Sequence, residues 1–189
     1  MNLETKQYLL KLARNTIEHY LDTESQLEVD ESDLKDDILK EKQGVFVTLE
    51  KHGQLRGCMG YIDPVEAVYT AVIENALKAS FGDPRFQPLA RQELAEIKIE
   101  ISVLSKSEKV SFDSPEQLLE KLEPMKHGVV IKKGPRSATY LPQVWEELSQ
   151  KEEFLSSLCK KAGLSPLEWK DGHVDVFVYT VEVFSENSV

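Results

Sequence analysis

Hydrophobic positions in the first half of the chain recur first with helical and then with strand spacing. Apolar residues between Leu9 and Tyr20 lie three or four positions apart, which predicts an amphipathic helix of about five turns. The acidic run 24–42 has few apolar positions, so we expect it to be a solvated crossover. Residues 44–49 and 55–62 then favour two strands, and the turn residues 51–54 between them indicate a hairpin.

The next elements are marked by a helix-start pattern and by alternation. Asp63 can cap a helix, Pro64 suits its first position, and Glu66 completes a capping box, so we expect a helix from there to about Ser80. The segment 83–89 contains two prolines and is predicted to be an irregular, rigid loop. Strict alternation over 97–103 predicts a half-buried strand.

The second half of the chain repeats these patterns. Ser114 precedes a short predicted helix, residues 128–133 form a strand, and Ser149 begins a second helix that ends at Gly163. Alternating valines from 174 to 183 predict one final long strand. The mixture favours an α+β fold with a mostly antiparallel sheet flanked by helices, and one domain over 1–189 with a second, smaller lobe.

Charge and cysteine content narrow the class of protein. Acidic residues number 33 and basic residues 23, giving a net charge of −10. This balance disfavours nucleic acid or an anionic membrane as the main partner, because both require a basic surface. We expect neither a signal peptide nor a membrane-spanning segment, and two cysteines cannot form a disulfide framework, so a cytoplasmic location is favoured.

Motifs for common cofactors are missing from the sequence. The four histidines are scattered without the short spacing of metal ligands, and the chain has neither a phosphate-binding loop nor a dinucleotide-binding turn. We therefore expect no metal and no cofactor. A nucleophilic cysteine needs a base, and the sequence leaves open which histidine, His127 or His173, would approach it.

Residues 55–62 place two glycines and a cysteine inside a predicted strand. Glycine there usually marks a bulge or the close approach of a ligand or another backbone. In a regular strand Arg56, Cys58 and Gly60 share one face, so a guanidinium would lie beside the thiol and favour the thiolate. The alternative is that Cys58 is a small buried hydrophobic residue. Asp83 and Arg85 are an acid and a base in the rigid loop, where such residues more often form structural hydrogen bonds than act on a substrate.

The sequence Leu-Arg-Gly-Cys-Met-Gly at 55–60 resembles the Leu-Arg-Gly-Cys-Ile-Gly signature of the AMMECR family, known in prokaryotes as AmmeMemoRadiSam system protein A. The resemblance continues through 83–86, 101–105, 141–144 and 161–164, and so covers nearly the whole chain. It implies a two-lobed α+β fold and a family without an established activity. It also implies a role alongside a Memo-type protein and a radical S-adenosylmethionine protein, and a function for Arg56, Gly57 and Cys58.

Three hypotheses remain open. In the first, Cys58 is a nucleophile or thiol carrier, Arg56 and the helix start at Asp63 hold an anionic group, and Arg85 assists. In the second, which we favour, the glycines admit a small anionic ligand or a partner protein, the basic residues bind it, and Cys58 packs. In the third, the glycines serve only tight packing. The candidate site residues are Arg56, Gly57, Cys58, Gly60, Asp83 and Arg85.

Overall fold

The computed structural model describes residues 1–188, which divide into two compact units. Unit 1 comprises residues 1–104 and the C-terminal segment from Glu182, and unit 2 comprises residues 105–181. The chain therefore passes from unit 1 into unit 2 once and returns once. Within residues 1–188, no helix combines the length and the apolar character that a bilayer crossing requires.

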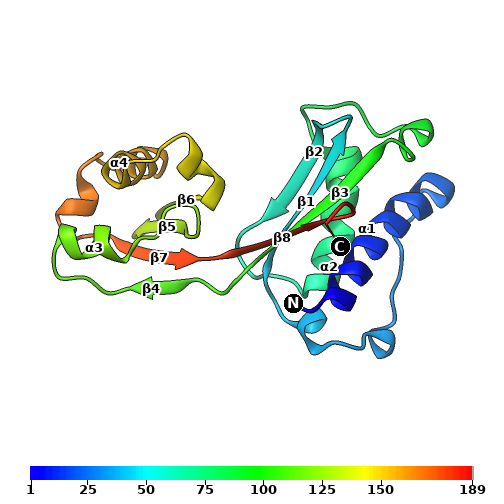
Figure 1. The fold of residues 1–189 in the computed structure, drawn as a ribbon, viewed down its shortest axis with the longest axis horizontal. Helices are drawn as coiled ribbons and strands as arrows, with labels where there is room; N and C mark the ends of the chain where they lie inside the picture. The colour runs from blue at the N-terminus through cyan, green and yellow to red at the C-terminus, as the bar shows by residue number, and fades with distance from the viewer. Residues whose placement is uncertain (189) are drawn as a thin grey trace. The chain divides into compact units, whose positions relative to one another are not determined.

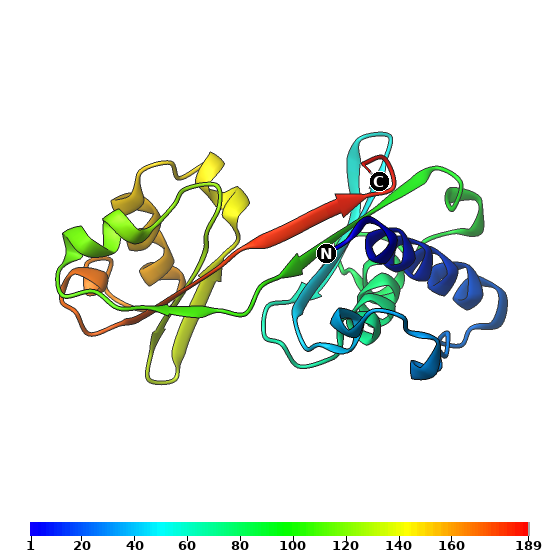
Figure 2. The same cartoon turned by 60° about the horizontal axis from the view of Figure 1, so that its bottom comes forward.

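Unit 1 is a four-stranded sheet with two helices packed against it (Figures 1 and 2). The strand order is β2-β1-β3-β8, and β1 is antiparallel to both of its neighbours. The helices are α1 (Leu3–Thr23) and α2 (Val68–Leu77), and α2 continues as a π-helical turn, η3 (Lys78–Gly82). The strands are β1 (Gly44–Lys51), β2 (Gln54–Tyr61), β3 (Ile97–Leu104) and β8 (Val181–Ser185), and three short 3-10 turns are η1 (Glu31–Asp33), η2 (Asp37–Lys40) and η4 (Arg91–Glu93).

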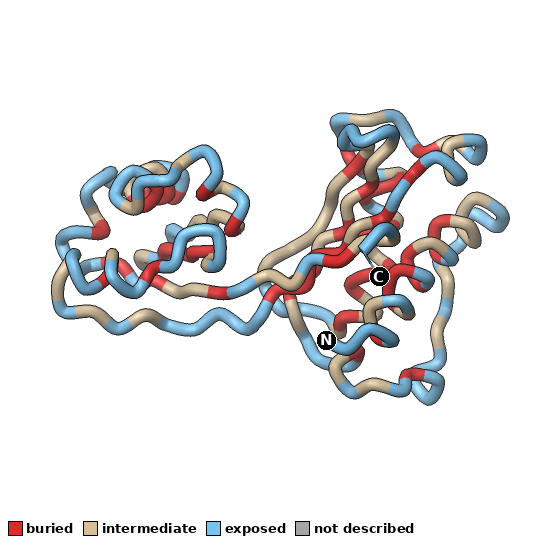
Figure 3. Tube along the Cα trace, in the orientation of Figure 1, coloured by how far each residue is buried: buried red, intermediate tan, exposed pale blue. Residues whose placement is uncertain are grey.

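Alternation along β1 decides which face of this sheet the helices cover. Val45, Val47 and Leu49 are fully buried in a core shared with α1 and α2. The intervening residues of β1 point to the opposite side. We call that opposite side, which carries Thr48 and its partners in the neighbouring strands, the outer face. Figure 3 shows the buried positions of unit 1 concentrated along the helices and the middle strands.

The predicted helix start at Asp63 is wrong. Residues 63–67 form a loop, and α2 begins at Val68 with Ala67 at its N-cap, which provides no side-chain cap. A tertiary contact replaces the cap, because the Val68 amide donates to the Glu41 carbonyl oxygen (2.9 Å) and Ala67 forms a β-bridge with Lys42. Asp63 therefore does not begin a helix beside Cys58.

Unit 2 contains the second sheet, in the order β4-β7-β5-β6, with its own hydrophobic core. Trp145 stacks on Phe154 with ring centroids 3.6 Å apart, and both tryptophan N–H groups of the chain find acceptors, for Trp145 the His127 carbonyl oxygen. Cys159 lies in this core with no exposed surface, as predicted. The elements are β4 (Glu108–Val110), α3 (Pro115–Lys121), β5 (Gly128–Lys133), β6 (Arg136–Tyr140), η5 (Pro142–Glu146), α4 (Lys151–Lys161), η6 (Glu168–Lys170) and β7 (Asp175–Tyr179).

Two predicted boundaries in this half differ from the structure. The single long strand over 174–183 is two strands separated at Thr180, with β7 in the unit 2 sheet and β8 in the unit 1 sheet. One extended run thus supplies a strand to each core, since Val176 is buried in one core and Phe184 in the other. Helix α4 begins at Lys151 with Gln150 as its N-cap, so Ser149 does not cap it. The predicted fold class, α+β with antiparallel sheets, is confirmed.

Candidate functional site

Strand β2 is an edge strand with a bulge at Arg56. Leu49 of β1 pairs with Gly57, and the next β1 residue, Glu50, pairs with Leu55, so β2 carries one extra residue between these pairs. A bulge re-aims the extra side chain and interrupts strict alternation. The predicted proximity of the Arg56 guanidinium to the Cys58 thiol rested on that alternation.

The Arg56 guanidinium binds Glu93 instead. Its Nε and Nη2 donate to the two carboxylate oxygens of Glu93 at 3.1 and 2.9 Å, and Nη2 also donates to the Gln87 carbonyl oxygen at 3.0 Å. This two-point bond, helped by the Ala90 amide, lowers the pKa of Glu93 to about 2. The Arg56 side chain is only 13% exposed, so it joins β2 to residues 87–93 rather than facing a ligand.

Asp83 and Arg85 bind the main chain of Cys58 along the free edge of the sheet, where β2 has no neighbouring strand within residues 1–188. The Cys58 amide donates to Asp83 Oδ2 (2.9 Å), and Arg85 Nη2 donates to the Cys58 carbonyl oxygen (3.2 Å). Arg85 also binds both Asp83 carboxylate oxygens, at 2.9 and 2.7 Å. Because β2 has no strand beyond it, this ion pair occupies the groups that an additional strand would bond. Both the amide and the carbonyl group of Cys58 are thereby bound at this edge.

The two members of this ion pair differ in how far their side chains are exposed. The Asp83 side chain is 1% exposed, whereas the Arg85 side chain is 54% exposed. The Arg85 guanidinium holds the pKa of Asp83 far below its ordinary range, and the backbone amides of Cys58 and Arg85 contribute to this shift. Arg85 lies with its guanidinium carbon 5.5 Å from the Phe86 ring centroid, and Arg56 lies 5.8 Å from the same ring.

Cys58 is a partly exposed residue on the outer face. Cys58 pairs directly with Thr48, whose hydroxyl donates to Sγ at 3.3 Å. No histidine ring among residues 1–188 forms a hydrogen bond with this thiol; His52, for example, is exposed at the hairpin turn beside Glu96, and His127 lies in unit 2. The group next to the sulfur is therefore a hydroxyl.

The two glycines of the motif admit neighbouring protein atoms. A β-carbon at Gly57 would lie 2.1 Å from the Ala79 carbonyl oxygen of η3, and one at Gly60 would lie 2.4 Å from the Val45 carbonyl oxygen. The expected close approach is thus made by the backbone of unit 1. Of the six candidate residues, Cys58, Asp83 and Arg85 come together, while Arg56, Gly57 and Gly60 shape the strand around them.

Sequence reasoning missed Thr48 and Glu93. Thr48 lay in a recognised strand, but a regular two-residue hairpin would have paired it with Gly57, and only the bulge brings it opposite Cys58. Glu93 is in a 3-10 turn with no distinguishing pattern, and its role is visible only through its contact with Arg56.

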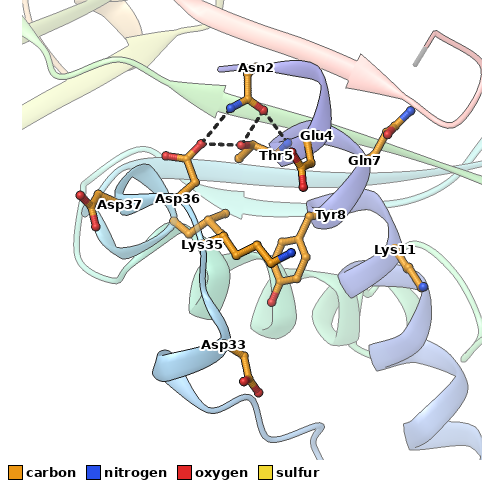
Figure 4. A pocket seen from close by; sticks show the side chains of 11 residues that line it. Asn2, Glu4, Thr5, Gln7, Tyr8, Lys11, Asp33, Lys35, Asp36 and Asp37 are labelled. Carbon is orange, nitrogen blue, oxygen red and sulfur yellow. Dashed lines mark hydrogen bonds between the residues drawn. The ribbon is translucent and has the colours of Figure 1, made fainter.

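A separate polar cavity of about 870 Å³ lies between the start of α1 and the 33–39 segment (Figure 4). At one end Asp36 accepts a hydrogen bond from the Thr5 hydroxyl (2.5 Å), and Asn2 caps α1 through the Thr5 amide (2.8 Å). None of the six candidate residues lines this cavity. Its lining is Asn2, Glu4, Thr5, Gln7, Tyr8, Lys11, Asp33, Lys35, Asp36, Asp37 and Leu39.

Comparison with known proteins places this chain in a family. The family model AMMECR1 matches residues 10–184, which includes both units and every residue of the Cys58 site. The chain belongs to the AMMECR1 family. The resemblance predicted from residues 55–60 is confirmed.

Relatives in archaea match along nearly their full length. The chain is 40% identical to Protein MK0488 of Methanopyrus kandleri, covering 98% of this chain and 90% of that protein. It is 38% identical to Protein PYRAB00100 of Pyrococcus abyssi, covering 97% and 91%. The crystal structure of an uncharacterized protein, PH0010 from Pyrococcus horikoshii, superposes with a TM-score of 0.82 at 36% identity, covering 100% of this chain and 94% of the other. The names of these relatives state no activity, so only the site itself indicates a chemistry.

Proposed function

We propose that this AMMECR1-family protein binds a small ligand with an anionic group on the outer face of unit 1, beside Cys58. The observation that carries the proposal is the fixed Cys58 main chain, whose amide and carbonyl group are both bound by the Asp83–Arg85 pair while the residue stays partly exposed. Cys159 provides the contrast, because it is sealed in the unit 2 core. A backbone held this firmly sets the position of the side chain that it presents.

Arg85 is the group that favours an anion. Its Nε and Nη2 are used by Asp83 and Cys58, but its side chain is half-exposed beside Phe86. Arginine presents its donors in a planar fork, so an exposed edge can still donate hydrogen bonds to a carboxylate or phosphate. Arg56 does not serve this purpose, because its side chain is only 13% exposed and its Nε and Nη2 are bound by Glu93.

A comparison of two alkylating agents tests the proposal. Iodoacetate is anionic and iodoacetamide is its neutral counterpart, and each forms an S–C bond at a thiolate with loss of iodide. If Arg85 binds an anionic group beside the thiol, the iodoacetate-to-iodoacetamide rate ratio at Cys58 will exceed that of free cysteine severalfold at low salt. Mass spectrometry of the Cys58 peptide measures both rates.

The control variants separate binding from altered access. Arg85→Gln is expected to return the ratio to that of free cysteine, whereas Arg91→Gln, which removes an exposed arginine paired with Asp22, is expected to leave it unchanged. Because a ratio is compared, a general change in accessibility cancels. A wild-type ratio equal to that of free cysteine would refute anion binding at this site.

The alternative function is a cysteine-dependent enzyme in which Cys58 is the nucleophile or thiol carrier. The observation that favours it is the Thr48 hydroxyl, which donates to Sγ at 3.3 Å. A Cys58 alkylation rate with the pH dependence of an ordinary thiol would speak against it.

The proposed setting is action alongside a Memo-type protein and a radical S-adenosylmethionine protein, and its support is the family resemblance. Pull-down of tagged wild-type protein with these two candidates from the same organism tests it. A pure binding role predicts that Cys58→Ala retains the partners, and failure of the wild-type protein to retain either one would contradict the association.

A further inference from the structure

Thr48 stands at the centre of a row of three side chains on the outer face. In the strand register Thr48 lies directly opposite Cys58 of β2 on one side and directly opposite Glu100 of β3 on the other. Directly opposed residues point to the same side of a sheet. The thiol, the hydroxyl and the carboxyl therefore follow one another across three adjacent strands.

The Glu100 carboxyl is half-buried and is not used by the fold. Among the hydrogen bonds and ion pairs within residues 1–188, none involves its side-chain oxygens, although it lies in an inner strand of the sheet. Glu93 and Glu186 are bound by Arg56 and Arg14, whereas Glu50 on β1 is, like Glu100, half-buried without a hydrogen bond or ion pair within residues 1–188. A half-buried carboxyl without a structural partner is harder to maintain in its charged form than a fully exposed one.

The charged surroundings of Glu100 favour its neutral form. Burial raises the pKa of Glu100, and the negative charge of Glu50 on β1 raises it further. Lys98 is exposed two residues away on β3, and Cys58 lies beyond Thr48. The carboxylates of Glu182 on β8 and of Glu186, just after it, are bound by the amino terminus, Lys6 and Arg14. The acid form of Glu100 is thus available as a proton donor at higher pH than an exposed glutamate provides.

We propose that Glu100 is the general acid for reactions of the Cys58 thiolate, donating a proton to a leaving group that lies over Thr48. Neighbouring strands are separated by about 4.8 Å, so Cys58 and Glu100 are roughly 10 Å apart at the backbone. Their side chains rise from the same face on either side of Thr48, so a group that leaves Sγ along the row moves toward the carboxyl. This inference rests on the alternative proposed function, in which Cys58 is the nucleophile, and names a second reacting residue for it.

Thiol–disulfide exchange makes the step explicit. Ionised Cys58 Sγ, whose proton has gone to water, forms a bond with one sulfur of a small disulfide, and the S–S bond of that disulfide breaks. The departing sulfur takes the bonding electron pair and a proton from Glu100, which becomes a carboxylate. Cys58 is oxidised to a mixed disulfide and the departing half is reduced to a thiol. An alkyl thiolate is a poor leaving group and gains from the proton, whereas a low-pKa aromatic one gains little.

Two neutral disulfides of different leaving-group quality test the proposal near pH 6. Glu100→Gln should slow the reaction of Cys58 with 2-hydroxyethyl disulfide at least ~10-fold, the lower range of a lost general acid. The same variant should change the reaction with 2,2′-dipyridyl disulfide by less than about twofold. Glu4→Gln, at an exposed glutamate of α1 on the opposite face of the sheet, should leave the ratio of the two rates within about twofold of wild type.

The outcomes separate this inference from the function on which it rests. Equal changes in both rates would show that Glu100 acts only through its charge, and no change in either would show that it takes no part; each overturns the proposal. If wild-type Cys58 reacts with neither disulfide, the thiol-chemistry function itself fails. The dipyridyl reaction and the far-ultraviolet circular dichroism of each variant report whether the site is still folded.

Discussion

Asp83 shows how one buried side chain positions another residue. Its carboxylate accepts from the amides of Cys58 and Arg85 and from the Arg85 guanidinium, and it is almost fully covered. The sequence predicts that an acid and a base in a rigid loop form structural hydrogen bonds, and the structure shows that they do. That their target is the main chain of Cys58 depends on contacts between segments 25 residues apart.

A change of Asp83 to asparagine should destabilise unit 1 in a pH-dependent way. Asp83→Asn removes a charge-assisted pair and should lower the free energy of unfolding by about 2 kcal/mol at neutral pH. The folded-state pKa of Asp83 lies below its unfolded value of about 3.9, so its contribution is complete above that pH and is lost as pH falls below it.

Urea unfolding of wild type and variant between pH 3 and 7, followed by far-ultraviolet circular dichroism, measures this difference. It should be constant from pH 5 to 7 and shrink below pH 4. Asp63→Asn, at an exposed aspartate of the same unit, should show no such difference. A gap between wild type and Asp83→Asn that stays constant or widens in acid would contradict the assignment.

At the scale of elements, the Cys58 site depends on how β2 meets β1 and η3. The bulge at Arg56 changes the partner of Thr48 from Gly57 to Cys58, and so creates the contact between hydroxyl and thiol. Gly57 then faces the start of the π-helical turn η3, where the Ala79 carbonyl oxygen occupies the space that a side chain would need. The same turn leads directly into Asp83, which links the packing of Gly57 to the position of Cys58.

Gly57→Ala tests this packing against a matched glycine. The added methyl group must displace the Ala79 backbone, so we expect a loss of about 1–3 kcal/mol in unfolding free energy and faster hydrogen exchange at Cys58. Gly82→Ala, at the other end of the same turn, has no atom within 4 Å of the added carbon and should be close to neutral. Equal stability of the two variants would show that β2 does not need this approach.

At the scale of the whole molecule, the chain builds two separate cores. Unit 1 buries α1, α2 and the middle strands, and unit 2 buries α4 and its own sheet around Trp145 and Trp169. Both tryptophans of the protein lie in unit 2, while Cys58 lies in unit 1. Each unit therefore carries its own spectroscopic or chemical reporter.

Leu158→Ala should weaken unit 2 selectively. Leu158 has no exposed surface and packs in the unit 2 core, so its truncation should cost about 2–5 kcal/mol. Tryptophan fluorescence should show an earlier urea transition, while hydrogen exchange in β1 and β3 should keep its wild-type rate. Equal loss of protection in both units would show that the two cores unfold together.

The local features of this protein can be predicted from its sequence. Periodicity predicts the helix α1, the hairpin of β1 and β2 and the strand β3. A strand buries every second residue and a helix every third or fourth, so each short segment shows its own hydrophobic pattern. The motif at 55–60 was enough to predict the family. The sequence also predicted that the lone Cys159 is core and that residues 83–89 form an irregular loop.

Tertiary structure alone decided the bulge at Arg56, the start of α2, the division of the final strand between two sheets, and the row from Cys58 through Thr48 to Glu100. The physical reason is that each depends on which backbone groups find partners in distant segments. Glu41 replaces a helix cap, Asp83 and Arg85 replace a strand, and a one-residue shift in register changes every cross-strand neighbour.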